Sequence, residues 1–247
     1  MTGSNRLKRL FALKLCILCC CLLLGACGTI TATPDNIYQL RTIHSPDGIG
    51  KFYQGREIAK VMGHTEALWL ERPAREVEEQ PQKLIDALNL DPTSVVADIG
   101  AGTGYFSFKL AQKLSLGKVF AVDIQPEMLD IIEFLKNENK ITNVEPILGS
   151  LTNFNLPEDS IDLAIMVDAY HELSQPREVM QEVVKALKPE GKVILVEYRR
   201  ENPFIAIKKL HKMTQKQAIK EMSNVGLKWV ETKSFLPSQH LLIFSKA

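Results

Sequence analysis

A glycine-rich turn after an apolar run carries residues that can bind a ligand through the backbone. The run Val95–Ile99 contains Asp98 and is followed by Gly100, Gly102 and Gly104, and then by an amphipathic stretch. Glycine permits backbone angles and a close ligand approach that a Cβ atom would block. A strand, a tight turn and a helix N-terminus in this order are typical of a site for a nucleotide-like ligand. A purely structural turn is the alternative interpretation.

A second acid supports the ligand-binding interpretation. Asp123 ends the next apolar run, Val119–Asp123, and one carboxylate can accept hydrogen bonds from two neighbouring ribose hydroxyls. A solvated acid at a strand end is the alternative. Dinucleotide-binding folds usually show G-x-G-x-x-G, whereas the third glycine here comes one residue earlier. This spacing argues against a nicotinamide-dependent oxidoreductase.

Three candidates for chemistry follow the predicted strand Ile161–Val167, namely Asp168, Tyr170 and His171. The carboxyl ends of strands in open α/β sheets face the ligand crevice, so we expect these side chains to meet the substrate. His171 can deprotonate an oxygen or nitrogen nucleophile, since imidazole titrates near neutral pH. A histidine that only holds a loop is the alternative. Glu172 is expected to support His171 rather than to act as a base.

The D-x-G-x-G-x-G motif joined to Asp123 resembles the class I S-adenosylmethionine (SAM)-dependent methyltransferases, over about residues 84–196. Within them the chain is similar to the ubiquinone and menaquinone biosynthesis enzymes and the type 11 and 25 groups, and looks most like an often secreted branch with a Tyr-His-Glu feature. The resemblance implies SAM as cofactor, methyl transfer to a small-molecule acceptor, and no metal. An exported SAM- or nucleoside-binding protein without turnover is the alternative function.

The resemblance also implies roles for individual residues. The glycine turn, including Ala101, would pack against the methionine part of SAM, and Asp98 would receive its amino group directly or through water. Asp123 would hold the ribose. Many relatives have an acid where Ser150 stands, which puts the contact to the adenine amino group in doubt. The full set of implied cofactor residues is Asp98, Gly100, Ala101, Gly102, Gly104, Asp123, Ile124, Met128, Ser150, Leu151 and Asp168.

Strands alternate with helices from residue 94 onward, which predicts an α/β fold with a mostly parallel sheet covered on both faces. The resemblance makes this sheet Rossmann-like and seven-stranded, with an antiparallel edge. The predicted strands are Val95–Ile99, Lys118–Val122, Val144–Leu148, Ile161–Val167, Lys192–Tyr198, Leu227–Lys233 and His240–Phe244. The predicted helices are Tyr105–Leu114, Pro126–Asn139, Pro176–Leu187 and Met213–Val225, with a turn at Gly191.

The methyltransferase domain is expected to span residues 91–247, and residues 54–90 are expected to form a helical extension that covers the cleft. Short helices are predicted at Gly55–Met62, Glu66–Leu70 and Ala74–Leu88. The basic stretch Lys208–Met213 could attract an acidic substrate, or it could be a solvated loop. Nothing in the charge distribution predicts a nucleic-acid partner.

The first 26 residues resemble a bacterial secretory signal that ends in a lipobox at Cys27. They combine a basic start with the apolar stretch Leu15–Leu24. All five cysteines of the 247-residue chain lie at or before Cys27. Cleavage before Cys27 would leave residues 27–53 as a tether and irregular N-terminal segment on a lipid anchor, facing the periplasm or the exterior. An uncleaved signal anchor is one alternative, and a cytoplasmic protein is another if the segment is not used for export. The sequence does not determine the oligomeric state.

Overall fold

The computed structural model describes residues 37–247. Residues Leu40–Ala247 form one compact unit. The predicted signal segment 1–26 and Cys27 lie outside the described residues. Within residues 37–247, none of the helices combines the length and the apolar character that a membrane crossing requires.

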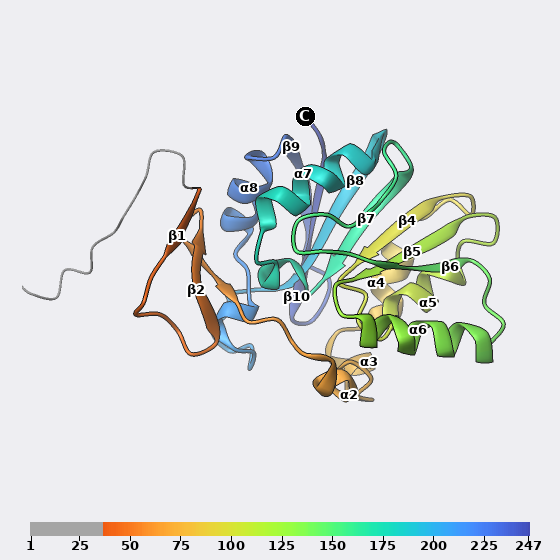
Figure 1. The fold of residues 1–247 in the computed structure, drawn as a ribbon, viewed down its shortest axis with the longest axis horizontal. Coiled ribbons are helices and arrows are strands. Elements are labelled where there is room, and N and C mark those ends of the chain that lie inside the picture. The colour runs from red at the N-terminus through yellow and green to blue at the C-terminus, as the bar shows by residue number, and fades with distance from the viewer. Residues whose placement is uncertain (1–36) are drawn as a thin grey trace, which may run out of the picture. The chain divides into compact units, whose positions relative to one another are not determined.

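A seven-stranded sheet forms the centre of the unit Leu40–Ala247, with strand order β6-β5-β4-β7-β8-β10-β9 (Figure 1). The neighbouring pairs from β6 to β8 are parallel, whereas β10 runs antiparallel to both β8 and β9. This arrangement confirms the predicted Rossmann-like α/β fold with an antiparallel edge. The strands are β4 (Val95–Ile99), β5 (Lys118–Asp123), β6 (Val144–Leu148), β7 (Ile161–Val167), β8 (Leu187–Tyr198), β9 (Leu227–Lys233) and β10 (Gln239–Lys246).

Helices cover both faces of the sheet because successive residues of each strand point to opposite sides. In β4, Ala97 and Ile99 share one core cluster with residues of α7 and α8, while Val96 belongs to a second cluster with residues of α4 and α5. Both faces are therefore apolar along the same strands, which explains their nearly continuous hydrophobic runs. The helices are α4 (Pro81–Ala87), α5 (Tyr105–Ala111), α6 (Pro126–Glu138), α7 (Pro176–Ala186) and α8 (Gln215–Ser223).

The segment before the sheet contains short elements. They are β1 (Tyr38–Leu40), β2 (Gly48–Tyr53), β3 (Arg56–Ala59), α2 (Ala67–Leu70) and α3 (Arg75–Glu78), with a 3₁₀ turn at His64–Glu66. The predicted helix Gly55–Met62 is wrong, since residues 56–59 form the strand β3, which pairs antiparallel with β2. Gln54 and Gly55 both have positive φ, at 52° and 93°. Two such residues make the tight turn that a β-hairpin needs, and this turn decides against the helix.

Three further boundaries differ from the predictions. The predicted helix Ala74–Leu88 is broken into α3 and α4 at Gln80, whose φ of 51° precedes Pro81 at the start of α4. The predicted turn at Gly191 is wrong, because β8 runs through it from Leu187. Helix α8 begins at Gln215 rather than at Met213, since the Thr214 side chain caps it by accepting the Gln217 N–H at 3.1 Å.

Candidate functional site

The carboxyl ends of the parallel strands open into a cavity of about 1030 Å³. Its wall consists of residues that follow β4, β5, β6 and β7, residues from the segment between β2 and α4, and residues from the loop that contains the 3₁₀ turn Lys209–His211. Small-molecule sites measure about 300–1,000 Å³, so this cavity has room for a cofactor together with an acceptor.

The glycine turn after β4 forms one wall of the cavity. Gly100, Gly102 and Gly104 have φ of 74°, 55° and 84°, and Gly100 and Gly102 line the cavity. The N–H groups of Gly100 and Ala101 both donate to the Val122 carbonyl, at 2.9 and 3.0 Å, which fixes the turn against β5. Ala101 is buried behind the turn, and Gly104 forms the N-cap of α5.

A Cβ atom has no room at either cavity-lining glycine. At Gly100 it would lie 2.6 Å from the Cβ atom of Ala169, and at Gly102 it would lie 2.6 Å from Leu70 Cδ1. Leu70 belongs to α2 and thus brings the predicted cover segment onto the glycine turn. Positive φ and a close approach together require glycine at both positions.

Asp98 lies beneath the turn rather than in the cavity wall. It is 2% exposed, and its Oδ2 accepts a hydrogen bond from Ser107 Oγ at 2.6 Å. Burial raises the pKa of the Asp98 carboxyl to about 6, against the opposing effect of the Ser107 hydrogen bond. Of the two predicted routes to a ligand's amino group, the one through a bridging water suits this position.

Asp123 ties the end of β5 to the glycine turn and also lines the cavity. Its Oδ2 accepts the Gly102 N–H at 2.9 Å, and its Oδ1 accepts the Gln125 N–H at 2.9 Å. Burial raises the pKa of this carboxyl, while the backbone hydrogen bonds lower it. Each carboxylate oxygen retains a second lone pair, so the side chain can still accept from two ligand hydroxyls.

The predicted adenine contacts all line the cavity. Ile124 and Met128 supply apolar surface, and Ser150 and Leu151 follow β6 on the same side. The Ser150 hydroxyl oxygen accepts the Asn153 N–H at 3.0 Å and so shapes the loop after β6. The backbone of this loop remains the better candidate for polar contacts.

Gln125 also lines the cavity, and sequence reasoning missed it. Its side-chain amide donates to the Met62 carbonyl at 3.1 Å and accepts the His64 N–H at 2.8 Å. It thereby fastens the segment after β3 to the end of β5. Its position, two residues after Asp123 at the strand end, is the feature of the sequence that could have identified it as a cavity residue.

Asp168 lines the cavity and has one buried carboxylate oxygen without a partner in the described part of the chain. Its Oδ2 accepts from Gln239 Nε2 at 2.5 Å, whereas Oδ1 is buried and has no hydrogen-bond partner among the described residues. Its backbone has a positive φ of 51°, a conformation that costs a non-glycine residue about 1–3 kcal/mol. Burial, together with the charges of Glu79 and Glu197, raises the pKa of Asp168 well above its usual value. A strained residue with a free acceptor at a cavity wall is a candidate ligand contact.

Tyr170 does not line the cavity. Its hydroxyl donates to Glu221 Oε2 at 2.7 Å in the buried interior. Arg56 donates to both carboxylate oxygens of Glu221 at 2.8 Å, and to the His171 carbonyl at 3.0 Å. Tyr170 therefore positions the chain next to His171. Arg56 and Glu221 are 165 residues apart, and no sequence signal connects them.

His171 lines the cavity and is held from behind by a buried carboxyl. Its Nδ1 lies 2.7 Å from Glu197 Oε2, and the side chains are 2% and 0% exposed. Burial lowers the pKa of His171 to about 3 and raises the pKa of Glu197 to about 8, since burial disfavours both charged forms. At neutral pH the pair therefore holds one proton and no net charge. This contact uses Nδ1 and leaves Nε2 of His171 for contacts on the other side of the ring.

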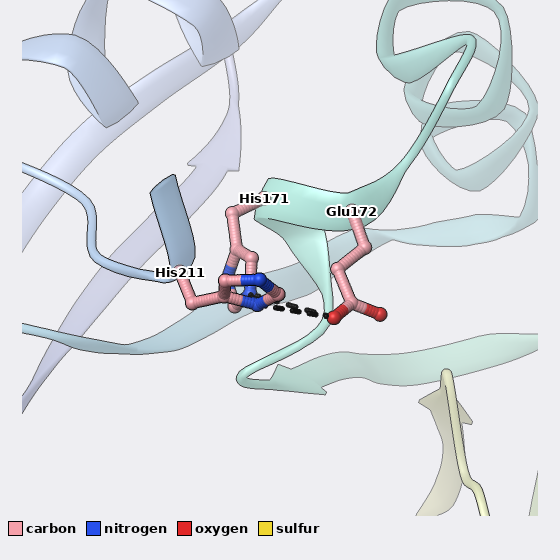
Figure 2. Close-up of side chains that lie close together, drawn as sticks. All are labelled: His171, Glu172 and His211. Carbon is pink, nitrogen blue, oxygen red and sulfur yellow. Dashed lines mark hydrogen bonds and ion pairs between the residues drawn. The ribbon is translucent and has the colours of Figure 1, made fainter. Parts of the chain in front are cut away.

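The other ring nitrogen of His171 meets two side chains at the cavity wall (Figure 2). Its Nε2 lies 3.1 Å from His211 Nδ1 and 3.8 Å from Glu172 Oε1. His211 Nδ1 in turn lies 3.3 Å from the same Glu172 oxygen. His211 was predicted only as part of a basic stretch, so the structure adds it to the site. Three potential metal ligands thus come together where the sequence predicted no metal.

The predicted cover segment and the end of β8 contribute a polar network to the wall of the cavity. Glu79 accepts from Arg72 at 2.6 Å, from Arg75 at 2.7 Å and from the Tyr198 hydroxyl at 2.9 Å. The Arg72 guanidinium lies 3.9 Å from the centre of the Trp69 ring. All five residues line the cavity. This part of the wall therefore consists of charged and aromatic side chains that contact one another.

Comparison with known proteins points to one family. Residues 90–238 match the family described as a methyltransferase domain. An uncharacterized methyltransferase-like protein of Schizosaccharomyces pombe is 32% identical over 148 residues, which cover 60% of this chain and 55% of that protein. The demethylmenaquinone methyltransferase of Chlamydia muridarum is 28% identical over 116 residues, covering 47% of this chain and 49% of that one. The chain thus spans about half the length of the curated relatives it matches.

A solved structure shows the same fold. The crystal structure of a SAM-dependent methyltransferase from Aquifex aeolicus superposes with a TM-score of 0.70 at 20% identity, covering 74% of this chain and 98% of that one. The fold and the family together indicate SAM as the cofactor.

The cavity wall fits that cofactor. Apolar side chains stand where an adenine would pack, Asp123 offers free lone pairs, and the turn at Gly102 has no Cβ atom to block an approach. SAM carries a positive sulfonium and an ammonium group. The unpartnered Asp168 oxygen is an acceptor suited to such a cation.

Proposed function

This chain belongs to the methyltransferase-domain family, and from that premise we propose that it transfers the methyl group of SAM to a small-molecule acceptor. The observation that carries the proposal is the hydrogen bond from the Gly102 N–H to Asp123. It joins the turn that would face the methionine part to the acid that would hold the ribose. A cofactor bound there would contact residues at the ends of two neighbouring strands, β4 and β5.

The residues of the cavity have separate tasks in this proposal. When bound, SAM supplies an electrophilic methyl group, which an acceptor lone pair takes as the carbon–sulfur bond breaks and S-adenosylhomocysteine leaves. Asp168 and the glycine turn orient the cofactor. Trp69 and Leu70 exclude water over the turn. Most of the rate enhancement would come from this alignment in a water-poor site.

His171 is the proposed proton acceptor for an O–H or N–H acceptor group. Its imidazole is neutral at pH 7 because burial lowers its pKa, so Nε2 has a lone pair when Nδ1 carries the proton. Glu197 contacts Nδ1 at 2.7 Å and would accept the Nδ1 N–H, which holds the ring in the tautomer with a free Nε2 lone pair. The acceptor's proton would thus move to Nε2 as the methyl group is transferred.

The place of action is proposed from the N-terminal segment. We infer a lipoprotein signal at residues 1–26, a lipid-modified Cys27 and a catalytic domain over 91–247. The predicted tether over 27–53 is shortened to the residues before β1, because β1 and β2 form a small sheet with β3, and the segment from β3 to residue 90 would cover the cavity. The protein would then act at the bacterial cell envelope, facing the periplasm or exterior. Mass spectrometry of the mature N-terminus tests this proposal, and an intact Met1 in the membrane fraction would contradict cleavage at Cys27.

Calorimetric titration of the full chain with SAM tests the cofactor, and we expect saturable binding. No binding at millimolar SAM would overturn the proposal. Incubation with methyl-labelled SAM and a cell-envelope extract tests turnover, and label in the small-molecule fraction is the expected result. Binding without any labelled product would instead favour the SAM-binding protein without turnover. Label on protein alone would contradict a small-molecule acceptor.

A further inference from the structure

The cluster formed by His171, Glu172 and His211 has the spacing of ligands around one metal ion. Their nearest ligand atoms are separated by 3.1, 3.3 and 3.8 Å. Zinc binds imidazole nitrogen and carboxylate oxygen at about 2.0–2.2 Å, which separates adjacent ligand atoms by about 3.0–3.5 Å. Three ligand atoms from two distant chain segments can therefore be bridged with only small side-chain movements (Figure 2).

Other contacts hold two of the ligands with their free lone pairs toward the centre. His171 uses Nδ1 for Glu197, at 2.7 Å, which leaves Nε2 for a metal. Glu172 uses Oε2 to accept the Met62 N–H at 3.1 Å, which leaves Oε1. A carboxylate behind a histidine fixes the ring and its tautomer in many metal sites. These outer contacts distinguish the cluster from side chains that meet by chance at a surface.

The local charge also favours a cation. Glu172 and Glu197 stand on either side of the His171 ring, and Glu197 Oε1 is buried without a hydrogen-bond partner among the described residues. The nearby buried cation, Arg56, is already paired with both oxygens of Glu221. A divalent ion would offset the charge of Glu172 and would favour the ionised form of Glu197, which is neutral without the ion.

We propose that His171, Glu172 and His211 bind one divalent transition-metal ion at the wall of the cofactor cavity. Two imidazoles and one carboxylate suit zinc or ferrous iron, whereas magnesium and calcium prefer all-oxygen ligand sets. All three residues line the cavity, so the remaining coordination positions face its interior. A hydroxyl or carbonyl oxygen of an acceptor could occupy one of them.

The metal's role in catalysis rests on the proposed methyl transfer, but its binding does not. A metal-bound hydroxyl loses its proton more readily, because the positive ion stabilises the oxyanion. With the ion bound, His171 Nε2 would be a ligand instead of the proton acceptor, and the hydroxyl proton would pass to solvent. The ion would then both activate and position the acceptor oxygen. The inferred acceptor class is therefore a small molecule with an oxygen that can bind a metal.

Cobalt titration of the full chain tests metal binding, since Co²⁺ substitutes for zinc and reports its ligands by visible absorption. The five cysteines, which could bind the ion themselves, are first blocked with N-ethylmaleimide. We expect one Co²⁺ per chain, displaced by Zn²⁺. Even loss of an outer contact costs about 10–100-fold in metal affinity, so His211→Ala should cost at least that much.

Glu172→Gln is a second variant, since its amide oxygen can still accept the Met62 N–H and preserve the local fold. His64→Ala is the matched control, because His64 lies outside the cluster and its side chain is 44% exposed. We expect weakened Co²⁺ binding in both cluster variants and wild-type binding in the control. Absence of saturable Co²⁺ binding to the wild type, or unchanged binding in both cluster variants, would overturn the proposal.

A SAM titration of the same proteins separates the two hypotheses. Metal binding without SAM binding would support the site and contradict the proposed cofactor. SAM binding without metal binding would contradict the site and leave the methyltransferase proposal intact.

Discussion

The carboxylate of Asp123 accepts the backbone N–H of Gly102 at 2.9 Å, so the end of β5 holds the turn that follows β4. One contact thus connects the two sequence features that predicted a cofactor site. Asp123 therefore has a structural task in addition to the binding role that we propose for it.

Asp123→Asn should weaken SAM binding by about tenfold or more, which corresponds to about 1.4 kcal/mol. The amide keeps one acceptor for Gly102 but loses the charge and the second acceptor oxygen. Calorimetric titration measures the change. Asp130→Asn is the matched control, because Asp130 is exposed on α6. Equal affinities for the two variants would contradict a cofactor role for Asp123.

Gly100→Ala should destabilise the protein more than Gly55→Ala. Both residues have positive φ, which costs an alanine about 1–2 kcal/mol, but only Gly100 lacks space. Its new Cβ atom would lie 2.6 Å from Ala169 Cβ, whereas the one at Gly55 would meet nothing within 4 Å. Urea unfolding measures both. Adding Ala169→Gly should restore part of the stability lost in Gly100→Ala, and no restoration would refute the clash.

Asp98→Asn should make the protein more stable at pH 8 than the wild type, and about equally stable near pH 3. Burial raises the pKa of Asp98 from its usual value near 4 to about 6, so the folded state binds more protons between these values. Wild-type stability is therefore lost as the pH rises through this window, by up to about 2–3 kcal/mol. The Ser107 hydroxyl can still donate to the amide oxygen.

Urea unfolding from pH 3 to pH 8 measures the difference between wild type and Asp98→Asn. A constant difference across this range would contradict the raised pKa. The same variant should bind SAM more weakly, because the carboxylate favours the cofactor's positive charges.

Glu221→Gln should destabilise the fold by about 3–5 kcal/mol, since it leaves the Arg56 guanidinium buried without a charged partner. The two side chains are 0% and 2% exposed and lie 2.8 Å apart. Glu145→Gln is the control, because its pair with Lys118 is exposed and should contribute less than about 1 kcal/mol. Thermal unfolding measures the stability of both variants. A similar loss of stability in the two would contradict a larger contribution from the buried pair.

His171→Gln should reduce methyl transfer while leaving SAM affinity within about twofold. The glutamine cannot take up the acceptor's proton, and general-base contributions amount to about 100-fold or more. The assay follows label from SAM into the envelope small-molecule fraction. A parallel loss of SAM affinity would mean that His171 supports the fold of the cavity instead of the reaction.

The sequence predicted the sheet well because strands buried on both faces are continuous hydrophobic runs, as in Val95–Ile99 and Ile161–Val167. It failed at Gly55–Met62, where an apolar pattern fits a helix or a strand equally well. There the positive φ of Gln54 and Gly55 selects the hairpin. The sequence also suggested Tyr170 as a catalytic candidate, whereas the Tyr170 hydroxyl donates to Glu221 in the interior.

The sequence by itself determined the fold and the family, and it predicted the residues of the proposed cofactor side of the cavity. These depend on local spacing: glycines on a tight turn after one strand, and an acid at the end of the next. Only the tertiary structure decided the acceptor side. Arg56, Glu197 and His211 meet His171 from three distant segments. Local periodicity in the sequence does not predict these contacts. They form only when the folded sheet brings its strand ends close to the segments before β4 and after β8.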